Sequence, residues 1–214
     1  MAEQFVRFFL VRHGETAENI QMRYLGTRDE PLTEKGVLQA RQAAEAISQL
    51  RIKIVVSSPM RRARDTALQI QQACGLELRL DSRLAEGSFG RWEGLSREEV
   101  LKLGGEDAEM LLRWESDSSI APPGGESIQH IQQRVTQLVD ELAAEFPDRS
   151  VVLVSHVGPI KALIAAVLGI SLEASRGFFL DPGTISVVEW SKHPVLRLFN
   201  SHAHFGWASA RWMR

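Results

Sequence analysis

The sequence predicts an α/β fold: a three-layer α/β/α sandwich with a mostly parallel central sheet and a small helical lid insertion. The first observation behind this prediction is that short apolar runs alternate along the chain with segments of helical periodicity. The second is that these apolar runs are continuous, as in strands that are buried on both faces. A sheet of such strands needs helices on both faces, which gives three layers.

The first half of the chain is expected to contain three strands and two helices. In chain order these are a strand over 8–11, a helix over 33–50, a strand over 52–56, a helix over 62–73 and a strand over 76–80. The apolar positions of the helix over 33–50 include Leu38, Ala40, Ala44 and Ile47. Gly75 is expected to end the next helix, because glycine is common just after a helix.

The second half begins with the clearest amphipathic helix, over 127–146. Its apolar residues recur at a spacing of about 3.6 residues, which places them on one stripe: they are Ile128, Ile131, Val135, Leu138, Val139, Leu142 and Phe146. A strand over 151–154, a helix over 159–168 and strands over 184–189 and 195–198 follow. Pro159 is expected at the first helical position, where proline is tolerated.

The segment of about 90–125 interrupts this alternation of strands and helices. It contains Trp92, Trp114, several acidic residues and a turn rich in proline and glycine at 122–125. We expect an insertion that folds as a lid over one end of the sheet, with both tryptophans in its core. The whole chain, 1–214, is then a single domain, because one domain commonly reaches ~200–250 residues.

Composition excludes several classes of protein. With 44% hydrophobic residues, 24% charged residues and a net charge of -2, the chain offers no electrostatic case for binding nucleic acid or an anionic membrane. A single cysteine, Cys74, excludes an internal disulfide and a cysteine-based metal cluster. The first residues are too charged for a signal peptide, and no apolar run approaches the ~18–20 residues that span a bilayer. We therefore expect a cytoplasmic protein.

Polar side chains follow three of the predicted strands at the point where each strand ends. Arg12 and His13 follow the first strand, Arg62 follows the second, and His156 follows the strand over 151–154. Ligands of open parallel sheets bind at the carboxyl ends of the strands. If the three strands are neighbours, two imidazoles and two guanidiniums meet at one patch.

Such a patch suits phosphoryl transfer. A guanidinium matches the oxygens of a phosphate or carboxylate, and histidine is a competent nucleophile toward phosphorus. Guanidinium and imidazolium groups can stabilise the charge on the transferred group without a metal. A protonated carboxyl group must supply a proton to the departing oxygen. Glu86 is the best candidate for this acid, and Glu93 and Glu15 are its competitors.

These residues lie in six ordered sequence blocks. The blocks are Leu10-Val11-Arg12-His13-Gly14-Glu15-Thr16 with Asn19; Pro31-Leu32-Thr33-Glu34-Lys35-Gly36 with Gln39-Ala40; Ser58-Pro59-Met60-Arg61-Arg62-Ala63 with Thr66-Ala67; Leu84-Ala85-Glu86 with Phe89-Gly90-Arg91-Trp92-Glu93-Gly94; Gly125-Glu126-Ser127; and Ser155-His156-Val157-Gly158. In this order they resemble the histidine phosphatase superfamily, also called the phosphoglycerate mutase-like family. The resemblance covers nearly the whole chain.

The resemblance implies a role for each matching residue. His13 would be the phosphorylated nucleophile, and Glu86 the general acid that later activates water. Phosphoryl oxygens would be held by Arg12, Arg62 and His156, with further hydrogen bonds from Thr16 and Asn19. Tyr24, Leu25, Gly26 and Arg28 are candidates for the lining of the substrate entrance, and the alternative is that they are ordinary loop residues. The family implies no metal and no organic cofactor.

The function expected is a metal-independent phosphatase that hydrolyses a small phosphorylated metabolite through a phosphohistidine intermediate. The alternatives are a cofactor-dependent phosphoglycerate mutase and a non-catalytic binding module of the same fold. The phosphatase is favoured over the mutase because Glu86 and His156 are only 70 positions apart, whereas mutases of this family carry a longer segment there. The sequence does not select a substrate, and it leaves the oligomeric state open between a monomer and a homodimer.

The remaining notable residues are expected to be structural. Arg61 and Arg64 are expected in surface salt bridges, His130 on a solvated helix face, and Cys74 in buried packing. His202 and His204 have a spacing that suits metal binding on a strand, but no third ligand is evident near them.

Overall fold

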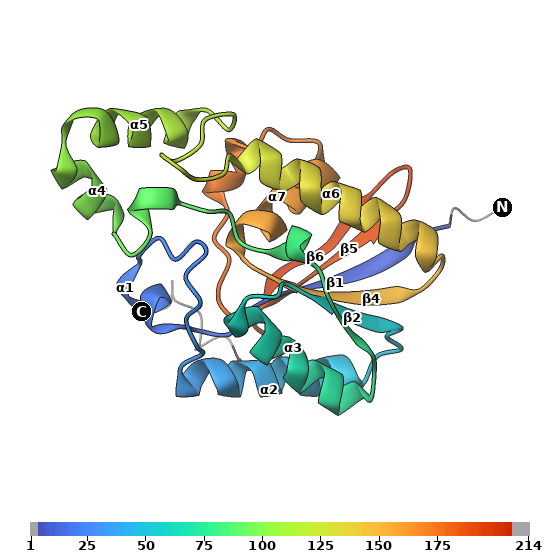
Figure 1. Cartoon of the computed structure of the whole chain (residues 1–214). Helices are drawn as coiled ribbons and strands as arrows, with labels where there is room; N and C mark the ends of the chain where they lie inside the picture. The colour runs from blue at the N-terminus through green and yellow to red at the C-terminus, as the bar shows by residue number, and fades with distance from the viewer. Residues whose placement is uncertain (1–3, 207–214) are drawn as a thin grey trace.

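The computed structural model describes residues 4–206, which form a six-stranded sheet with helices on both faces (Figure 1). The strand order is β3-β2-β4-β1-β5-β6. The strands are β1 (Val6–Arg12), β2 (Ile54–Ser57), β3 (Leu78–Leu80), β4 (Ser150–Ser155), β5 (Ile185–Trp190) and β6 (Val195–Ser201). The first four strands of that order pair in parallel, and β5 and β6 continue the sheet antiparallel. The predicted α/β class with a mostly parallel sheet is confirmed.

Helices α2 and α3 cover one face of the sheet, and α6 and α7 cover the other (Figure 1). The helices are α1 (Ala17–Gln21), α2 (Glu34–Ser48), α3 (Arg61–Cys74), α4 (Arg97–Leu103), α5 (Gly105–Ser116), α6 (Ile128–Glu145) and α7 (Val157–Leu168). Three short 3-10 turns are η1 (Ser82–Leu84), η2 (Gly90–Trp92) and η3 (Ala174–Gly177). None of the helices within residues 4–206 combines the length and the apolar character needed to cross a membrane.

The sheet is buried on both faces, as its continuous apolar strands predict. Phe8 and Leu10 of β1 pack with α6 and α7, whereas Val11 packs with α2 and α3. The predicted stripe of α6 is buried over Ile131, Val135, Leu138, Val139 and Leu142. Cys74 is half-buried and packs against the core under α2 and α3.

Two details of the predicted helices are wrong. Helix α7 begins at Val157 with His156 as its N-cap, so Pro159 is its third residue and not its first. Proline is tolerated there because the N–H groups of the first turn have no acceptor within the helix. Leu38, expected among the apolar positions of α2, is 55% exposed because it lies on the solvent side of that helix.

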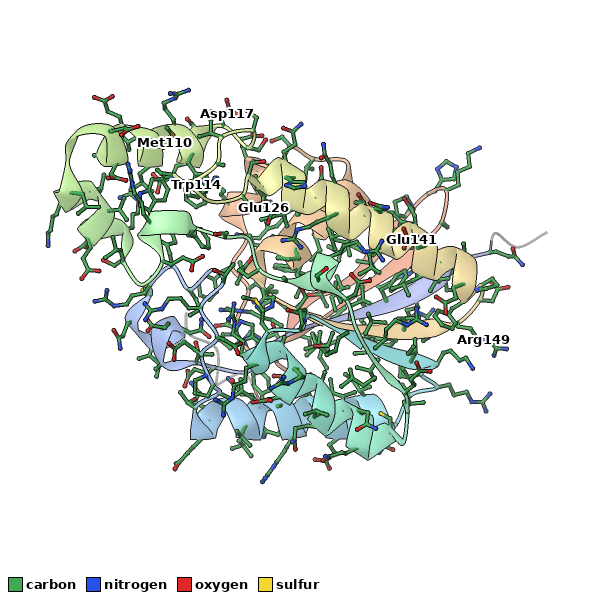
Figure 2. All side chains as sticks on the ribbon, viewed as in Figure 1. Met110, Trp114, Asp117, Glu126, Glu141 and Arg149 are labelled. Atoms are coloured by element: carbon green, nitrogen blue, oxygen red, sulfur yellow. The ribbon has the colours of Figure 1, made fainter. Side chains whose placement is uncertain are left out.

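The segment of 90–125 contains η2, α4 and α5, which lie beyond one end of the sheet (Figure 1). Trp92, Val100 and Leu111 are fully buried in a small core of this segment. Trp114 packs edge-on against Trp92, with ring centroids 6.1 Å apart, on the side of α5 that faces the rest of the molecule (Figure 2). The single-domain organisation of 1–214 with a lid stays a prediction.

The loop after β1 lies directly against the first turn of α2. A Cβ added to Gly14 would stand 2.2 Å from the carbonyl oxygen of Gly36, and a Cβ on Gly36 would stand 2.2 Å from the carbonyl oxygen of Glu15. Because both oxygens belong to the backbone, no side-chain rotation relieves these contacts. The two glycines therefore set how close the loop that carries His13 lies to α2.

Gly36→Ala is expected to lower the free energy of unfolding by about 1–3 kcal/mol, because the added methyl group forces two backbone segments apart. Urea unfolding of the purified variant measures this change. Gly177→Ala is the matched control, since a Cβ there meets no atom within 4 Å. Equal stability of Gly36→Ala and the wild type would contradict the close approach.

Candidate active site

The carboxyl ends of three adjacent strands, β2, β4 and β1, bring the predicted residues together. His13 follows β1, Arg62 lies in the first turn of α3 after β2, and His156 follows β4. The ring centroids of His13 and His156 are 5.0 Å apart. Both rings and both guanidiniums are buried: Arg12 is the most exposed of the four at 6%. The convergence predicted from the strand ends is therefore observed.

His13 has the tautomer that a nucleophile requires. Its Nδ1 lies 2.7 Å from the carbonyl oxygen of Gly14. A carbonyl can only accept, so Nδ1 carries the proton and Nε2 carries the free lone pair. Burial, and then the positive charges of Arg62 and Arg12, hold the pKa of His13 well below its ordinary value of 6.5. The ring is neutral near pH 7.

His156 is also neutral, but both of its ring nitrogens are engaged. Arg62 Nε donates to Nδ1 at 3.2 Å, so the proton lies on Nε2, which donates to Ser58 Oγ at 2.8 Å. Burial, followed by the charge of Arg62, holds the pKa of His156 well below 6.5. An N–H of His156 therefore reaches a phosphoryl oxygen, as predicted, only if Ser58 gives up its hydrogen bond.

The guanidinium of Arg62 is held by backbone carbonyls. It donates to the carbonyl oxygens of Arg28 and Gly26 at 2.8 and 2.9 Å, besides its bond to His156. Arg12 donates to the carbonyl oxygen of Leu180. The two carbonyl acceptors of Arg62 fix the plane of its guanidinium, and a carbonyl acceptor does not cancel the positive charge.

The residues predicted at the substrate entrance divide into two groups. Gly26 and Arg28 contact the site through the carbonyl oxygens that hold Arg62. The Arg28 side chain is half-exposed beside Glu30. Tyr24 belongs to an aromatic cluster, stacked on Phe89 at 4.8 Å between ring centroids. Its position is set by the packing of the 90–125 segment, which local sequence does not encode.

Thr16 and Asn19 hydrogen-bond to each other. Thr16 is the N-cap of α1: its hydroxyl accepts from the Asn19 backbone N–H, and the Asn19 side chain accepts from the Thr16 N–H. This reciprocal capping box starts α1 just after the nucleophile loop. The hydrogen bonds that the resemblance implies from both residues to a phosphoryl group stay a prediction.

Glu86 lies in a dry position that favours its acid form. Burial raises its pKa above the ordinary 4.5, against the lowering effects of Arg62 and of the Gly87 N–H. Its Oε1 accepts from the N–H groups of Gly87 and Gly158, at 3.0 and 3.1 Å. The second of these lies at the start of α7, two residues from His156. This placement sets the carboxyl group against the first turn of α7, whose N-cap is His156.

The loop that carries Glu86 is held from two sides. Ser155 at the end of β4 donates to the carbonyl oxygen of Leu84, and Arg134 of α6 donates to that of Ala85. The two competing carboxylates are engaged elsewhere. Glu93 accepts from Thr27, Ser88 and Phe89, and Glu15 pairs with Lys35 at 2.7 Å. The structural contacts of these two residues leave Glu86 as the candidate acid.

Several supporting residues have no role in the sequence-based prediction. Thr66 of α3 accepts from the Gly14 N–H at 3.1 Å and donates to the Arg62 carbonyl at 2.8 Å, so it joins the nucleophile loop to α3. Ser58 positions His156, as described above. Ser58 and Thr66 both lie in the sequence blocks given above, and this is the only sequence signal that points to a supporting role for them. Leu180 contributes a backbone carbonyl, which leaves no signal in sequence.

His202 and His204 lie after the end of β6 and not on a strand. His202 Nε2 is 2.9 Å from Asp181 Oδ2, with both side chains buried, and His204 Nε2 is 2.8 Å from the Gly183 carbonyl oxygen. The Gly183 N–H in turn donates to the carbonyls of Arg12 and His13. The two histidines thus hold the segment that contains Asp181 and Gly183 against the chain at His13. Within residues 4–206, no three His, Cys, Asp or Glu side chains are grouped so that they could hold a metal ion.

The other residues expected to be structural are placed as follows. Arg61 and Arg64 both face Asp65 at the surface, at 3.5 and 3.8 Å. His130 is exposed on α6, with Nδ1 at 3.3 Å from Glu126. These contacts agree with the predicted surface roles.

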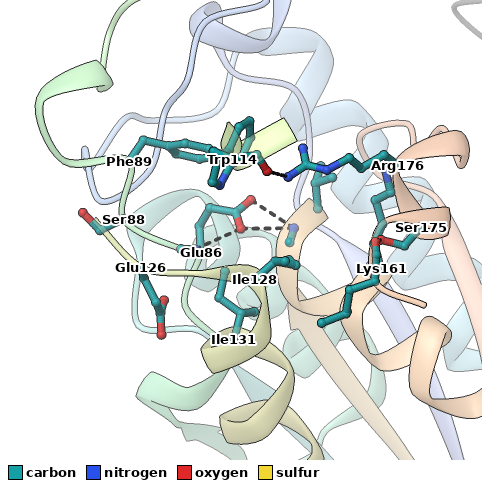
Figure 3. Close-up of a pocket in the computed structure, with 14 residues that line it drawn as sticks. Glu86, Ser88, Phe89, Trp114, Glu126, Ile128, Ile131, Lys161, Ser175 and Arg176 are labelled. Atoms are coloured by element: carbon teal, nitrogen blue, oxygen red, sulfur yellow. Dashed lines mark hydrogen bonds between the residues drawn. The ribbon is translucent and has the colours of Figure 1, made fainter. Parts of the chain in front are cut away.

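A cavity of about 170 Å³ opens beside Glu86 (Figure 3). Its walls come from α7, η3, the start of α6 and the 90–125 segment. Glu86 and Gly158 line it, whereas His13 does not. An acid group that lines a cavity can protonate an oxygen that departs into that cavity.

Comparison with known proteins identifies a family. The family model described as the histidine phosphatase superfamily (branch 1) matches residues 8–201. Phosphoserine phosphatase 1 of Hydrogenobacter thermophilus is 34% identical over 204 residues, which cover 94% of this chain and 95% of that protein. A glucosyl-3-phosphoglycerate phosphatase of Mycobacterium tuberculosis is 40% identical over 173 residues, covering 76% of this chain and 75% of that protein.

Other relatives are longer than this chain. The chain spans about half the length of a bifunctional protein of Mycobacterium tuberculosis, to which it is 37% identical over 185 residues, with 86% of this chain and 50% of that protein covered. A solved structure also resembles this chain. It is a phosphoserine phosphatase variant of Entamoeba histolytica in complex with phosphoserine, and it superposes with a TM-score of 0.84 at 31% identity. The match covers 94% of this chain and 100% of that chain.

The lowered pKa values of His13 and His156 predict how stability depends on pH. Both rings hold their proton less tightly in the folded protein than in the unfolded chain, whose histidines titrate near 6.5. Below about pH 6.5 the unfolded state therefore binds more protons, and the free energy of unfolding falls as the pH drops from 7 toward the folded pKa values. His204, whose pKa burial also lowers, acts in the same direction, whereas Glu86, whose pKa burial raises, contributes with the opposite sign at lower pH.

Urea unfolding at pH 7.5, 6.5 and 5.5, together with NMR titration of the ring nitrogens, measures both quantities. We expect the signals of His13 and His156 to remain those of neutral rings at pH 6.5. A folded pKa above 6.5 for either ring would contradict the neutral state of the imidazoles at pH 7.

Proposed function

The chain belongs to the histidine phosphatase superfamily (branch 1), and from this membership we propose that it is a phosphatase that hydrolyses a small phosphorylated metabolite. The family predicted from the six sequence blocks is confirmed by the model match over residues 8–201. The observation that carries the proposal is the neutral His13 ring, fixed by Gly14 and placed beside two buried guanidiniums.

In the first step His13 Nε2 attacks phosphorus with its lone pair. The bond from phosphorus to the ester oxygen breaks, and that oxygen takes the proton of Glu86 as the alcohol departs. The product is a phosphohistidine, with Glu86 as a carboxylate. The charge that develops on the transferred phosphoryl oxygens is stabilised by Arg12 and Arg62, whose positive charges act on His13.

In the second step Glu86 accepts a proton from water as the water oxygen attacks phosphorus. The phosphorus–nitrogen bond breaks, its electron pair returns to His13 Nε2, and inorganic phosphate leaves. The same carboxyl group thus serves as acid and then as base, which its raised pKa supports. Each turnover consumes one ester and one water and regenerates both side chains.

The substrate is a small phosphorylated molecule, in line with the names of relatives that act on phosphoserine and glucosyl-3-phosphoglycerate. A near-neutral chain offers no surface charge for nucleic acid or an anionic membrane. The cytoplasmic location and the choice between monomer and homodimer stay predictions. The single cysteine among 214 residues supports the cytoplasmic location, because a chain without internal disulfides suits a reducing compartment.

The nucleophile is tested by trapping the intermediate. Rapid acid-free quenching of the enzyme with a ³²P-labelled substrate should give a protein-bound label that is stable to alkali and labile to acid, as a phosphohistidine is. His13→Ala should abolish the label and lower kcat/KM by a factor on the order of 10³ or more. His130→Ala, which alters an exposed histidine of α6, is the control and should match the wild type. Wild-type activity in His13→Ala would remove the proposed nucleophile.

The acid is tested by varying the leaving group. Glu86→Gln should lower kcat/KM for an alkyl phosphate by about 10²–10⁴-fold, because an alkoxide cannot depart without a proton. For p-nitrophenyl phosphate, whose leaving group needs no proton, the loss in kcat/KM should be within about tenfold. If the phosphoryl transfer to His13 is irreversible, kcat/KM reports only this first step. The role of Glu86 as base in the second step therefore does not affect the measured kcat/KM. Equal losses for both substrates would contradict its role as acid.

A further inference from the structure

The cavity beside Glu86 has an uneven distribution of charge. Apolar and aromatic side chains form much of its wall, among them Phe89, Trp114 and Ile131. Two cationic side chains, Lys161 and Arg176, line the same space (Figure 3). A mostly apolar cavity with a few convergent polar groups is the usual form of a small-molecule site.

The ammonium group of Lys161 lines this cavity without a bonded partner among residues 4–206. Within residues 4–206 its ammonium group makes no hydrogen bond and no ion pair. Burial, and then the charges of Arg176 and Arg12, lower its pKa to about 8. A half-buried ammonium group without a partner costs free energy that an anion would recover.

The two carboxyl groups that line the cavity do not serve as that anion. Glu126 is bonded twice by Arg134, at 2.9 Å to each oxygen. Glu86 accepts from Gly87 and Gly158, and its raised pKa favours the neutral acid. The cavity therefore holds more positive than negative charge.

Arg176 is held in one orientation. Its guanidinium lies over the ring of Trp114, with Cζ 4.2 Å from the centroid, and donates to the carbonyl oxygen of the same residue (Figure 3). These contacts use one terminal nitrogen and one face of the guanidinium. The guanidinium is thus fixed beside the cavity, and its remaining N–H groups can donate to a ligand.

We propose that this cavity receives the alcohol part of the substrate and that Lys161, aided by Arg176, binds a carboxylate on it. The substrate class is then the phosphomonoester of a small hydroxy acid. This inference rests on the proposed function, because the alcohol departs past Glu86 into the cavity. The apolar wall strengthens the attraction between the ammonium and the carboxylate by keeping water out.

A carboxylate fits this site better than a second phosphate. A carboxylate brings one charge and two oxygens, which the ammonium of Lys161 and the remaining donors of Arg176 satisfy. A phosphate brings about -1.5 to -2 charges and three oxygens. The larger charge makes it more costly to desolvate against the aromatic wall of Phe89 and Trp114.

The test compares 3-phosphoglycerate with glycerol 3-phosphate, which differ only in a carboxylate against a hydroxymethyl group. We expect a wild-type kcat/KM that is about 10- to 100-fold higher for 3-phosphoglycerate. Lys161→Met should reduce this preference to within about threefold, mainly through KM, while kcat/KM for glycerol 3-phosphate changes little. Lys161→Arg should keep much of the preference, because the cation remains.

Lys53→Met is the matched control, since Lys53 is exposed at the opposite, amino end of β2. It should leave both values of kcat/KM unchanged. Hydrolysis of both esters without preference, or a Lys161→Met loss of equal size for both, would overturn the carboxylate site and leave the phosphatase intact. Hydrolysis of neither ester, while p-nitrophenyl phosphate is still hydrolysed, would also overturn the carboxylate site. Failure to hydrolyse p-nitrophenyl phosphate as well, with no phosphohistidine formed, would overturn the phosphatase itself.

Discussion

Two guanidiniums buried at the carboxyl edge of the sheet determine the chemistry of this site. Arg12 and Arg62 are oriented by hydrogen bonds to the backbone carbonyls of Leu180, Gly26 and Arg28. Burial, and then the field of these guanidiniums, lowers the pKa of His13 and His156 and keeps both imidazoles unprotonated. The same field that makes His13 a neutral nucleophile attracts a phosphate dianion. One arrangement thus supplies both reactivity and binding.

The fold places these groups with little freedom. Three neighbouring parallel strands end at one edge, and each delivers one part of the cluster. The backbone contacts of Gly14 and Gly36 fix the nucleophile loop against α2, and Thr66 joins it to α3. Since parallel strands require long crossovers, the residues that react come from segments far apart in the chain. Packing of the layers, more than local structure, sets the distances between them.

Much of this could be predicted from the sequence, because strand ends and apolar periodicity are local signals. The stripe of α6 and the convergence of His13, Arg62 and His156 follow from such signals and are observed. The sequence predicts the start of α7 two residues too late, at Pro159, because a proline suits any position of the first turn. The contacts from backbone carbonyls, and the cavity shared by Lys161 and Arg176, depend on tertiary packing. No local pattern predicts them.

The claim on which the account depends is that His13 Nε2 bonds to the transferred phosphorus. A crystal structure of the protein with vanadate, which mimics the transition state of the transfer, tests it most directly. The account predicts vanadium bonded to His13 Nε2, oxygens beside Arg12 and Arg62, and Glu86 next to the apical oxygen on the opposite side. Vanadate bonded to another side chain, such as Ser58, or bound away from both imidazoles, would contradict it.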